Sequence, residues 1–267
     1  MLKRYAAPLA VAALTLALYA AVIVLGVRLG PAGLSFLQPS VLKEKMWRQG
    51  GAGRSADVAL GRVLFNETPV YGAKYVSGRV SCANCHLEGG TAPFASPVVG
   101  IVGSFPMYSK RSGRKITLED RVQECMTRSE NGQPLPSDSA EMKGLLAYIG
   151  WLSEPHRGQA EFVGRGLEAL PVLTGKPVHG QQVYAAQCAG CHGVHGEGAR
   201  RPFPPLWGPD AFNDGAGMNG VEKMAAFVQY NMPQNRKGIL SAQDAFDVAT
   251  FIHEQPRPAF NHAYDRF

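Results

Sequence analysis

The chain has 267 residues, of which 45% are apolar and 18% charged, and this composition excludes an intrinsically disordered or collagen-like protein. Five cysteines are too few, and odd in number, for a scaffold held together by disulfides, so each thiol needs its own explanation. The formal net charge of +6 favours anionic partners but does not choose between nucleic acid, lipid headgroups and small oxyanions.

The N-terminal segment has the length and composition of a membrane-spanning helix. Residues 5–27 contain no charged side chain over 23 positions, and a helix needs about 20 residues to cross a bilayer. A cleaved secretory signal is the alternative, although its apolar core is usually shorter, about 7 to 15 residues. Because Lys3 and Arg4 make the N-terminal flank the more basic one, we expect residues 1–40 to be an anchor or signal with its linker, and the globular part to lie on the periplasmic side of the inner membrane.

The rest of the chain contains the same order of features twice. Each copy begins with a glycine three residues before an apolar-aromatic pair, continues with Cys-x-x-Cys-His and ends in a segment of helical periodicity. The last segments begin after Ser139 and Ser241, which are suitable helix N-caps, and no alternating strand pattern competes with them. We therefore predict an all-α fold with two tandem domains. The predicted bounds are 41–155 for the first domain, 156–178 for a linker and 179–267 for the second domain.

The repeated motif Cys-x-x-Cys-His is the sequence signature of covalent attachment of haem c. Its two thiols bond to the haem, and the adjacent histidine binds the iron from the proximal side. A zinc site or a redox pair would explain a single Cys-x-x-Cys, but not two copies that are each followed by histidine. We therefore predict two cytochrome c-like domains with one covalently bound haem c each. The predicted attachment residues are Cys82, Cys85 and His86 in the first domain, and Cys188, Cys191 and His192 in the second.

The second domain offers a methionine as the distal ligand of its iron. Met232 lies 40 residues after His192, in an Asn-Met-Pro sequence just before the last predicted helix. Ligation by His and Met raises the reduction potential of a haem, which suits it to passing electrons on. The alternatives within reach by sequence are Met218, Lys223 and Met224.

The fifth cysteine is the candidate distal ligand of the first haem. Cys125 lies 39 residues after His86, nearly the same separation as in the second domain, and it has no cysteine partner left in the chain. A thiolate ligand lowers the potential relative to His/Met ligation, so electrons would run from the first haem to the second. A buried inert thiol is the ordinary alternative for Cys125. The alternative ligands are Met107, Met126 and Met142.

The residues around Cys125 predict a cationic setting for this thiol. Thr117 and Asp120 have the spacing of a capping box, which predicts a helix from about Leu118 through Cys125. Neighbouring cations favour the thiolate, which is both a nucleophile and an iron ligand. On an α-helix three residues would share the face of Cys125: Arg121, Arg128 and Ser129.

With these residues the sequence resembles the dihaem cytochrome c thiosulfate dehydrogenases over nearly everything that follows the N-terminal segment. The resemblance implies that two thiosulfates are joined into tetrathionate at a His/Cys-ligated haem, in a reaction that some members run in reverse. Segments that carry it are 118–121, 128–129, 131–132, 134–136, 141–142, 203–208 and 215–218.

Motif positions carry the family's functional residues over to this chain. The resemblance implies that Cys125 is the catalytic ligand and that Met232 binds the second iron. Some members have a lysine, a possible iron ligand, where this chain has Asn231. The residues implied as substrate contacts are Arg111, Arg121 and Ser129.

Two other functions stay open at the level of sequence. One is a membrane-tethered dihaem electron carrier without a substrate, in which Cys125 is structural. The other is a sulfur-carrier subunit related to the SoxA cytochromes, in which the cysteine is persulfurated and a partner protein is needed. The expected partners are thiosulfate, tetrathionate, the membrane and a downstream cytochrome or high-potential electron acceptor, with no role for nucleic acid.

Overall fold

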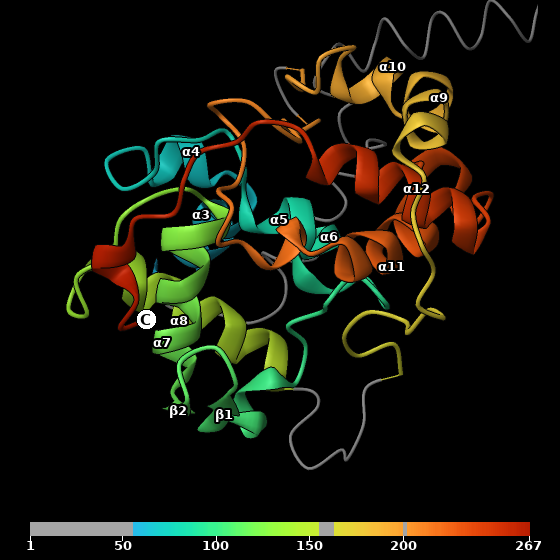
Figure 1. Cartoon of the computed structure of the whole chain (residues 1–267). Coiled ribbons are helices and arrows are strands. Elements are labelled where there is room, and N and C mark those ends of the chain that lie inside the picture. The colour runs from blue at the N-terminus through green and yellow to red at the C-terminus, as the bar shows by residue number, and fades with distance from the viewer. Residues whose placement is uncertain (1–55, 155–162, 200–201) are drawn as a thin grey trace, which may run out of the picture. The chain divides into compact units, whose positions relative to one another are not determined.

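The computed structural model describes residues 56–154, 163–199 and 202–267, which are mostly helical (Figure 1). These residues belong to one compact unit, Ser55–Phe267. The segment predicted as a membrane anchor, residues 1–40, lies outside the described residues. In the part of the chain that the structure describes, no helix is both long and apolar enough to cross a bilayer.

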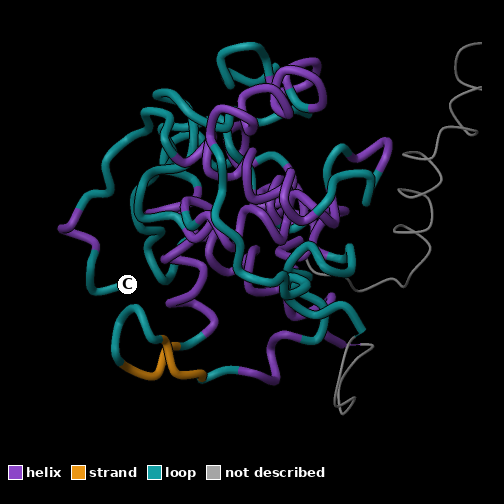
Figure 2. Tube along the Cα trace, turned by 45° about the vertical axis from the view of Figure 1, so that its right-hand side comes forward, coloured by secondary structure: helices purple, strands orange, loops and turns teal. Residues whose placement is uncertain are grey.

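The described residues of the first half, 56–154, form six α-helices, one π-helical turn and a short ribbon of two antiparallel strands, drawn in orange in Figure 2. The ribbon was not predicted, because strands of three residues are too short to show alternation in a sequence. The elements are α3 (Ala56–Asn66), α4 (Thr68–Tyr71), α5 (Cys82–Cys85), α6 (Leu87–Gly90), the 3₁₀ turn η1 (Ile101–Ser104), β1 (Met107–Ser109), β2 (Arg114–Ile116), α7 (Leu118–Glu124), the π-helix η2 (Cys125–Ser129) and α8 (Ala140–Ser153).

The second half repeats the helical pattern without the ribbon. Both predicted N-caps are confirmed, since the side chain of Ser139 accepts a hydrogen bond from the Met142 amide and that of Ser241 accepts one from the Asp244 amide. The elements are α9 (Pro177–Gln187), α10 (Ala189–His192), α11 (Val221–Asn231), α12 (Ala242–His253) and the 3₁₀ turns η4 (Gly217–Asn219), η5 (Gln234–Arg236) and η6 (His262–Tyr264).

One glycine in each half lets the first and last helices cross closely. A Cβ atom added at Gly61 of α3 would lie 1.9 Å from the carbonyl oxygen of Gly144 in α8, and one added at Gly180 of α9 would lie 2.0 Å from that of Asp247 in α12. No side chain fits at either crossing. Since these glycines are the equivalent positions of the sequence repeat, the packing supports a tandem duplication.

The two halves share part of their interior. A cluster of buried apolar side chains combines Leu87, Ala92 and Ala95 of the first half with Phe227 of the second. The C-terminal residues, red in Figure 1, lie against the first half, where Arg114 donates a hydrogen bond of 3.0 Å to the carbonyl oxygen of Arg266. The haem motifs of the two halves therefore sit on one continuous packed body.

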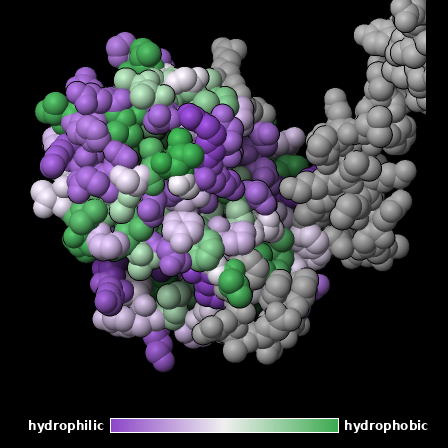
Figure 3. All heavy atoms as spheres, turned by 90° about the vertical axis from the view of Figure 1, so that its right-hand side faces the viewer, coloured by the Kyte–Doolittle hydropathy of each residue, from purple (hydrophilic) through white to green (hydrophobic). Residues whose placement is uncertain are grey.

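The described surface carries scattered hydrophobic residues. On the face shown in Figure 3, green residues are dispersed among purple and white ones. Single exposed hydrophobic side chains are normal and need no partner to explain them. The functional chemistry is therefore sought inside the unit, around the two haem motifs.

Candidate haem and substrate site

Each Cys-x-x-Cys-His motif forms a short helical turn whose histidine is oriented by a backbone carbonyl. The Nδ1 atom of His86 lies 2.5 Å from the carbonyl oxygen of Ser96, and that of His192 lies 2.9 Å from the carbonyl oxygen of Pro204. Since a carbonyl only accepts, Nδ1 carries the proton in both rings and Nε2 keeps its lone pair for a metal. Burial lowers the pKa of both histidines, which keeps the rings neutral.

The cysteines of both motifs keep the sulfurs that covalent attachment needs. None of the five cysteines is paired in a disulfide, although Cys-x-x-Cys pairs are close enough in sequence to form one. In the first motif, the capping box of Ser81 and Asn84 begins α5 and fixes the turn that presents Cys82 and Cys85. Two thiols and one imidazole nitrogen in each half are a donor set that fits haem c.

Cys125 stands where α7 changes its hydrogen-bonding pattern. The predicted capping box is confirmed, because the Asp120 amide donates to Thr117 Oγ1 at 3.1 Å and the Thr117 amide donates to Asp120 Oδ2 at 2.8 Å. The predicted helix from Leu118 is confirmed and carries Cys125, whose amide bonds to the Arg121 carbonyl, but a π-helical turn begins at this residue and the Glu130 amide bonds to its carbonyl at 3.0 Å. Single π-turns inside helices are frequent at functional sites.

The structure gathers most of the predicted catalytic residues around the first haem motif. The Cys125 thiol lies within electrostatic reach of both Cys82 and Cys85. The positive charges of Arg121 and Arg111 both work to lower the pKa of the same thiol. Ser129, the fourth predicted catalytic residue, closes the π-turn that Cys125 opens.

Burial decides the protonation of the Cys125 thiol. Removal from water raises its pKa to about 11, with Arg121 and Arg111 acting in the opposite direction and Glu130 and Glu124 adding to the increase. The two cations favour the thiolate, as the sequence predicted, but the effect of burial is larger at this position. Coordination by a metal ion deprotonates a thiol outright, so the predicted iron ligation would hold Cys125 as the thiolate.

Arg128 does not take the place that α-helical spacing predicts. Its guanidinium lies 3.7 Å from the centre of the Phe260 ring, and its Nη2 donates to the carbonyl oxygen of Phe267 at 3.4 Å. The hydrogen bonds of a π-turn run from residue i to i+5, so residues three apart no longer share one face. Arg128 thus anchors the C-terminal segment, while Arg121 stays with Cys125.

Two buried carboxyl groups near Cys125 were missed by the sequence analysis. Glu124 forms an ion pair of 2.5 Å with Arg121, a spacing of three residues that is visible in the sequence. Glu130 has no comparable signal; burial raises its pKa to about 8, and its Oε2 atom has no hydrogen-bond partner among the described residues. Glu124 orients the Arg121 guanidinium, which is the more exposed partner of the pair.

Two of the candidate ligands of the second iron, Met218 and Met232, are partly buried methionines. Met232 follows α11, and both Met232 and Met218 pack on the core of the second half and on the cluster shared with the first half. Lys223 is exposed and Met224 is buried in the core, so neither is placed like Met232. Ligation by Met232 stays a prediction. Its neighbour Asn231 is buried and donates from Nδ2 to the carbonyl oxygens of Phe94 and Phe227, both at 3.0 Å.

The alternative distal ligands of the first motif lie elsewhere. Met126 and Met142 are core residues with 2% and 0% of their surface exposed, and Met107 is exposed on β1. The burial of Met126 and Met142 is explained by packing, and ligation of the first haem by Cys125 stays a prediction.

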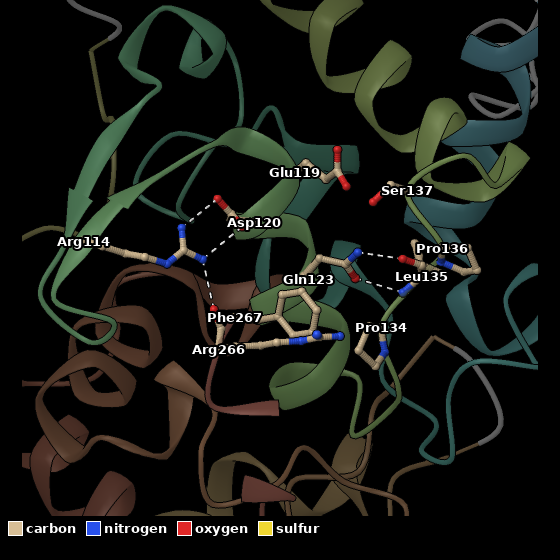
Figure 4. Close-up of a pocket in the computed structure, with 10 residues that line it drawn as sticks. All are labelled: Arg114, Glu119, Asp120, Gln123, Pro134, Leu135, Pro136, Ser137, Arg266 and Phe267. Atoms are coloured by element: carbon tan, nitrogen blue, oxygen red, sulfur yellow. Dashed lines mark hydrogen bonds and ion pairs between the residues drawn. The ribbon is translucent and has the colours of Figure 1, made fainter. Parts of the chain in front are cut away.

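A cavity of about 590 Å³ adjoins α7 (Figure 4). In it Arg114 forms an ion pair of 3.1 Å with Asp120, while Gln123 bonds both backbone polar groups of Leu135 at 2.7 Å and 2.9 Å. The described residues that line the cavity include none of the four predicted catalytic residues. These contacts connect α7 to β2 and to the loop that precedes α8.

Comparison with known proteins agrees with this organisation. Residues 68–157 match the family described as SoxA/TsdA, cytochrome c domain, and residues 175–252 match the one described as cytochrome C oxidase, cbb3-type, subunit III. The thiosulfate dehydrogenase of Allochromatium vinosum is 42% identical over 214 residues, which cover 76% of this chain and 79% of that protein. The chain belongs to the thiosulfate dehydrogenase family.

Two further members of the thiosulfate dehydrogenase family are similar to this chain over most of its length. The thiosulfate dehydrogenase of Stutzerimonas stutzeri is 38% identical over 233 residues, covering 85% of this chain and 75% of that protein. The solved structure of thiosulfate dehydrogenase (TsdBA) from Marichromatium purpuratum, in its as-isolated form, superposes with a TM-score of 0.73 at 34% identity. The superposed part covers 78% of this chain and 47% of the chain in the solved structure. The predicted family and the tandem cytochrome c domains are thus confirmed.

Proposed function

We propose that this protein oxidises thiosulfate and joins two thiosulfates into tetrathionate on the periplasmic side of the inner membrane, with an N-terminal anchor as its link to the membrane. The observation that carries the proposal is the meeting of Cys125, Arg121 and Arg111 beside the first haem motif. The names of its relatives, which are thiosulfate dehydrogenases, support the choice of substrate.

The residues of both motifs fit a covalently bound haem c, which supplies a one-electron acceptor at each site. Cys82, Cys85 and His86 would hold the first group, with Cys125 as its distal ligand. The second group would be held by Cys188, Cys191 and His192, with Met232 as its distal ligand. Because thiolate lowers and thioether raises the potential, electrons would pass from the first site to the second and then to a separate acceptor protein.

The arginines have to overcome the repulsion between two dianions. Two unit charges 4 Å apart repel by about 4 kcal/mol at the effective dielectric constant of a protein surface. Arg121 and Arg111 place positive charge where the sulfonate groups would sit, and Glu124 keeps the Arg121 guanidinium in one orientation. Cations held in place before the reaction need no reorganisation when charge accumulates.

The sulfur of Cys125 would take part in the bond changes. First, the cysteine thiolate and the outer sulfur of thiosulfate form an S–S bond, and the two electrons given up leave for the acceptors, which yields Cys–S–S–SO₃⁻. The outer sulfur of a second thiosulfate then attacks the sulfur atom that is bonded to Sγ of Cys125. The new S–S bond completes tetrathionate, and the cysteine thiolate leaves. The sum is two thiosulfates giving tetrathionate and two electrons, with no proton taken up or released.

The test is reduction of the purified dihaem protein by thiosulfate alone, with tetrathionate measured as product. We expect haem reduction and tetrathionate in the wild type, and haem content without turnover in Cys125→Gly, because the nucleophile is removed. Ser137→Gly, in the cavity beside α7, is the control and should behave as wild type.

Two results would contradict the proposal. A wild type that thiosulfate cannot reduce would be an electron carrier without this substrate. A Cys125 that gains sulfur mass only when a second protein is present would indicate a sulfur-carrier subunit instead.

A further inference from the structure

A buried residue of the second half reaches the π-turn that carries Cys125. Asn213 lies in the loop between α10 and α11, with 2% of its surface exposed. Its Nδ2 atom donates to the carbonyl oxygen of Thr127 at 2.8 Å and to Oδ1 of Asn131 at 3.1 Å. Its backbone amide donates to the carbonyl oxygen of Arg128 at 3.2 Å. Three donated hydrogen bonds thus run from this one residue to the turn and to Asn131, two residues beyond it.

The π-turn needs this outside donor. The two amides that could reach the Thr127 carbonyl within the helix are those of Asn131 and Gly132. The Asn131 amide bonds to the carbonyl of Arg128 at 3.3 Å, and the Gly132 amide bonds to that of Met126 at 2.9 Å. Thr127 is buried, so its carbonyl would be left without a partner if Asn213 were absent.

The loop around Asn213 is shaped to hold this contact. The Gly215 amide donates to Asn213 Oδ1 at 3.1 Å, which sets the orientation of the amide group and points Nδ2 at the turn. A Cβ atom added at Gly215 would lie 2.9 Å from both Nη1 of Arg128 and the side chain of Phe260. The loop, the π-turn and the stacked pair of Arg128 and Phe260 therefore fit together closely.

We propose that Asn213 is a positioning residue that holds the π-turn of Cys125 and Ser129 from within the second cytochrome c domain. This inference rests on the proposed function, in which Cys125 faces the first haem motif. Without Asn213, the unpartnered Thr127 carbonyl favours a return to α-helical hydrogen bonding, which rotates Cys125 and Ser129 relative to that motif. The second domain then does more than receive electrons, since it also shapes the catalytic turn of the first.

The experiment compares Asn213→Leu and Asn213→Asp with wild type. Both side chains are close to asparagine in size, and neither ionised aspartate nor leucine can donate to the Thr127 carbonyl. The control is Asn219→Leu, which removes a hydrogen bond of the same kind, 2.9 Å from Nδ2 to the Asp214 carbonyl, in the same loop region but not to the π-turn.

The first readout is the electron paramagnetic resonance of the resting protein, which reports the distal ligand of each haem before substrate is added. We expect two haems per chain in every variant, the thiolate signature of the first haem lost or split in both Asn213 variants, and the signature of the second haem unchanged. The second readout is steady-state kinetics, in which we expect kcat to fall about 100-fold with little change in KM.

The possible outcomes separate the two proposals. Asn213 variants that match Asn219→Leu in both readouts would overturn the positioning role while leaving the proposed function intact. A wild type without any thiolate signature would overturn both, because Cys125 would then not be a ligand at all.

Discussion

Arg121 and Arg114 belong to the same basic stretch of sequence, but the structure gives them different surroundings. Arg121 pairs with the buried Glu124 and acts electrostatically on Cys125. Arg114 pairs with Asp120 beside the cavity that contains no predicted catalytic residue. The two arginines therefore form a matched pair for separating substrate contact from general positive charge.

We predict that Arg121→Ala lowers kcat/KM for thiosulfate by about 100- to 1000-fold, the usual effect of removing one preorganised group that stabilises charge in a transition state. Both kcat and KM should change, because the guanidinium contacts substrate before and during the reaction. Steady-state kinetics with Arg114→Ala as the control checks this. Equal losses in the two variants would mean that only the net charge matters.

At the residue scale, the sequence was sufficient to predict candidate site residues where the chemistry depends on residue type and count. Cys125 is predicted as a ligand because it is the one cysteine outside the haem motifs and because its separation in sequence from His86 nearly matches that of Met232 from His192. Arg128 was misplaced, since nothing in the sequence distinguishes a π-turn from an α-helix. The role of Asn213 depends on a contact between residues 86 positions apart, which no local pattern reveals.

At the element scale, α7 is held at its start by a capping box that includes a titratable group. Hydrogen bonds and the charge of Arg114 lower the pKa of Asp120 from its ordinary value of 3.8. A carboxylate whose pKa is lower in the folded than in the unfolded state stabilises the folded state. This contribution is complete at pH values above the unfolded-state pKa and is lost as the pH falls through the folded-state pKa.

We predict that Asp120→Asn is less stable than wild type by about 1 kcal/mol at neutral pH, since the charge at the helix N-terminus and the ion pair are lost. The difference should begin to shrink as the pH falls below 3.8, where the unfolded carboxyl becomes protonated, and be lost as the pH falls through the lower pKa of the folded wild type. Urea unfolding of both proteins across this range measures it. A difference that stays constant with pH would show that the charge of Asp120 is irrelevant.

The crossing of α3 and α8 gives a second prediction at this scale. Gly61→Ala places a methyl group against the backbone of Gly144, so we expect a loss of about 3 kcal/mol in the free energy of unfolding. Gly150→Ala in α8 is the control, because an added Cβ meets no atom within 4 Å there and alanine favours helix. Chemical denaturation compares them. Similar stability of Gly61→Ala and wild type would mean that the crossing is loose.

Elements were predictable where a local signal marks their ends. Ser139, Ser241 and the Thr117–Asp120 pair identified three helix starts, because side-chain capping leaves a recognisable spacing. The strand ribbon and the π-turn had no such signal, since both depend on contacts made only in the folded chain.

At the scale of the whole molecule, the duplication was visible in the sequence but the joining of its halves was not. Arg79 donates to Asp210 at 2.8 Å and also bonds to the carbonyl oxygen of Glu197, and Asn231 bonds to the Phe94 carbonyl. Together with Asn213 these polar contacts connect the surroundings of the two motifs. Since the Phe94 carbonyl lies two residues before Ser96, which orients His86, the proximal side of the first site adjoins the predicted distal loop of the second.

The central claim is that the Cys125 sulfur is the distal ligand at the first haem site. The most direct measurement is the paramagnetic resonance spectrum and midpoint potential of the first haem in wild type and in Cys125→Met. The account predicts thiolate ligation and a low potential in the wild type, and a raised potential with the thiolate signature absent in the variant. Spectra and potentials that are the same in the two proteins would contradict it.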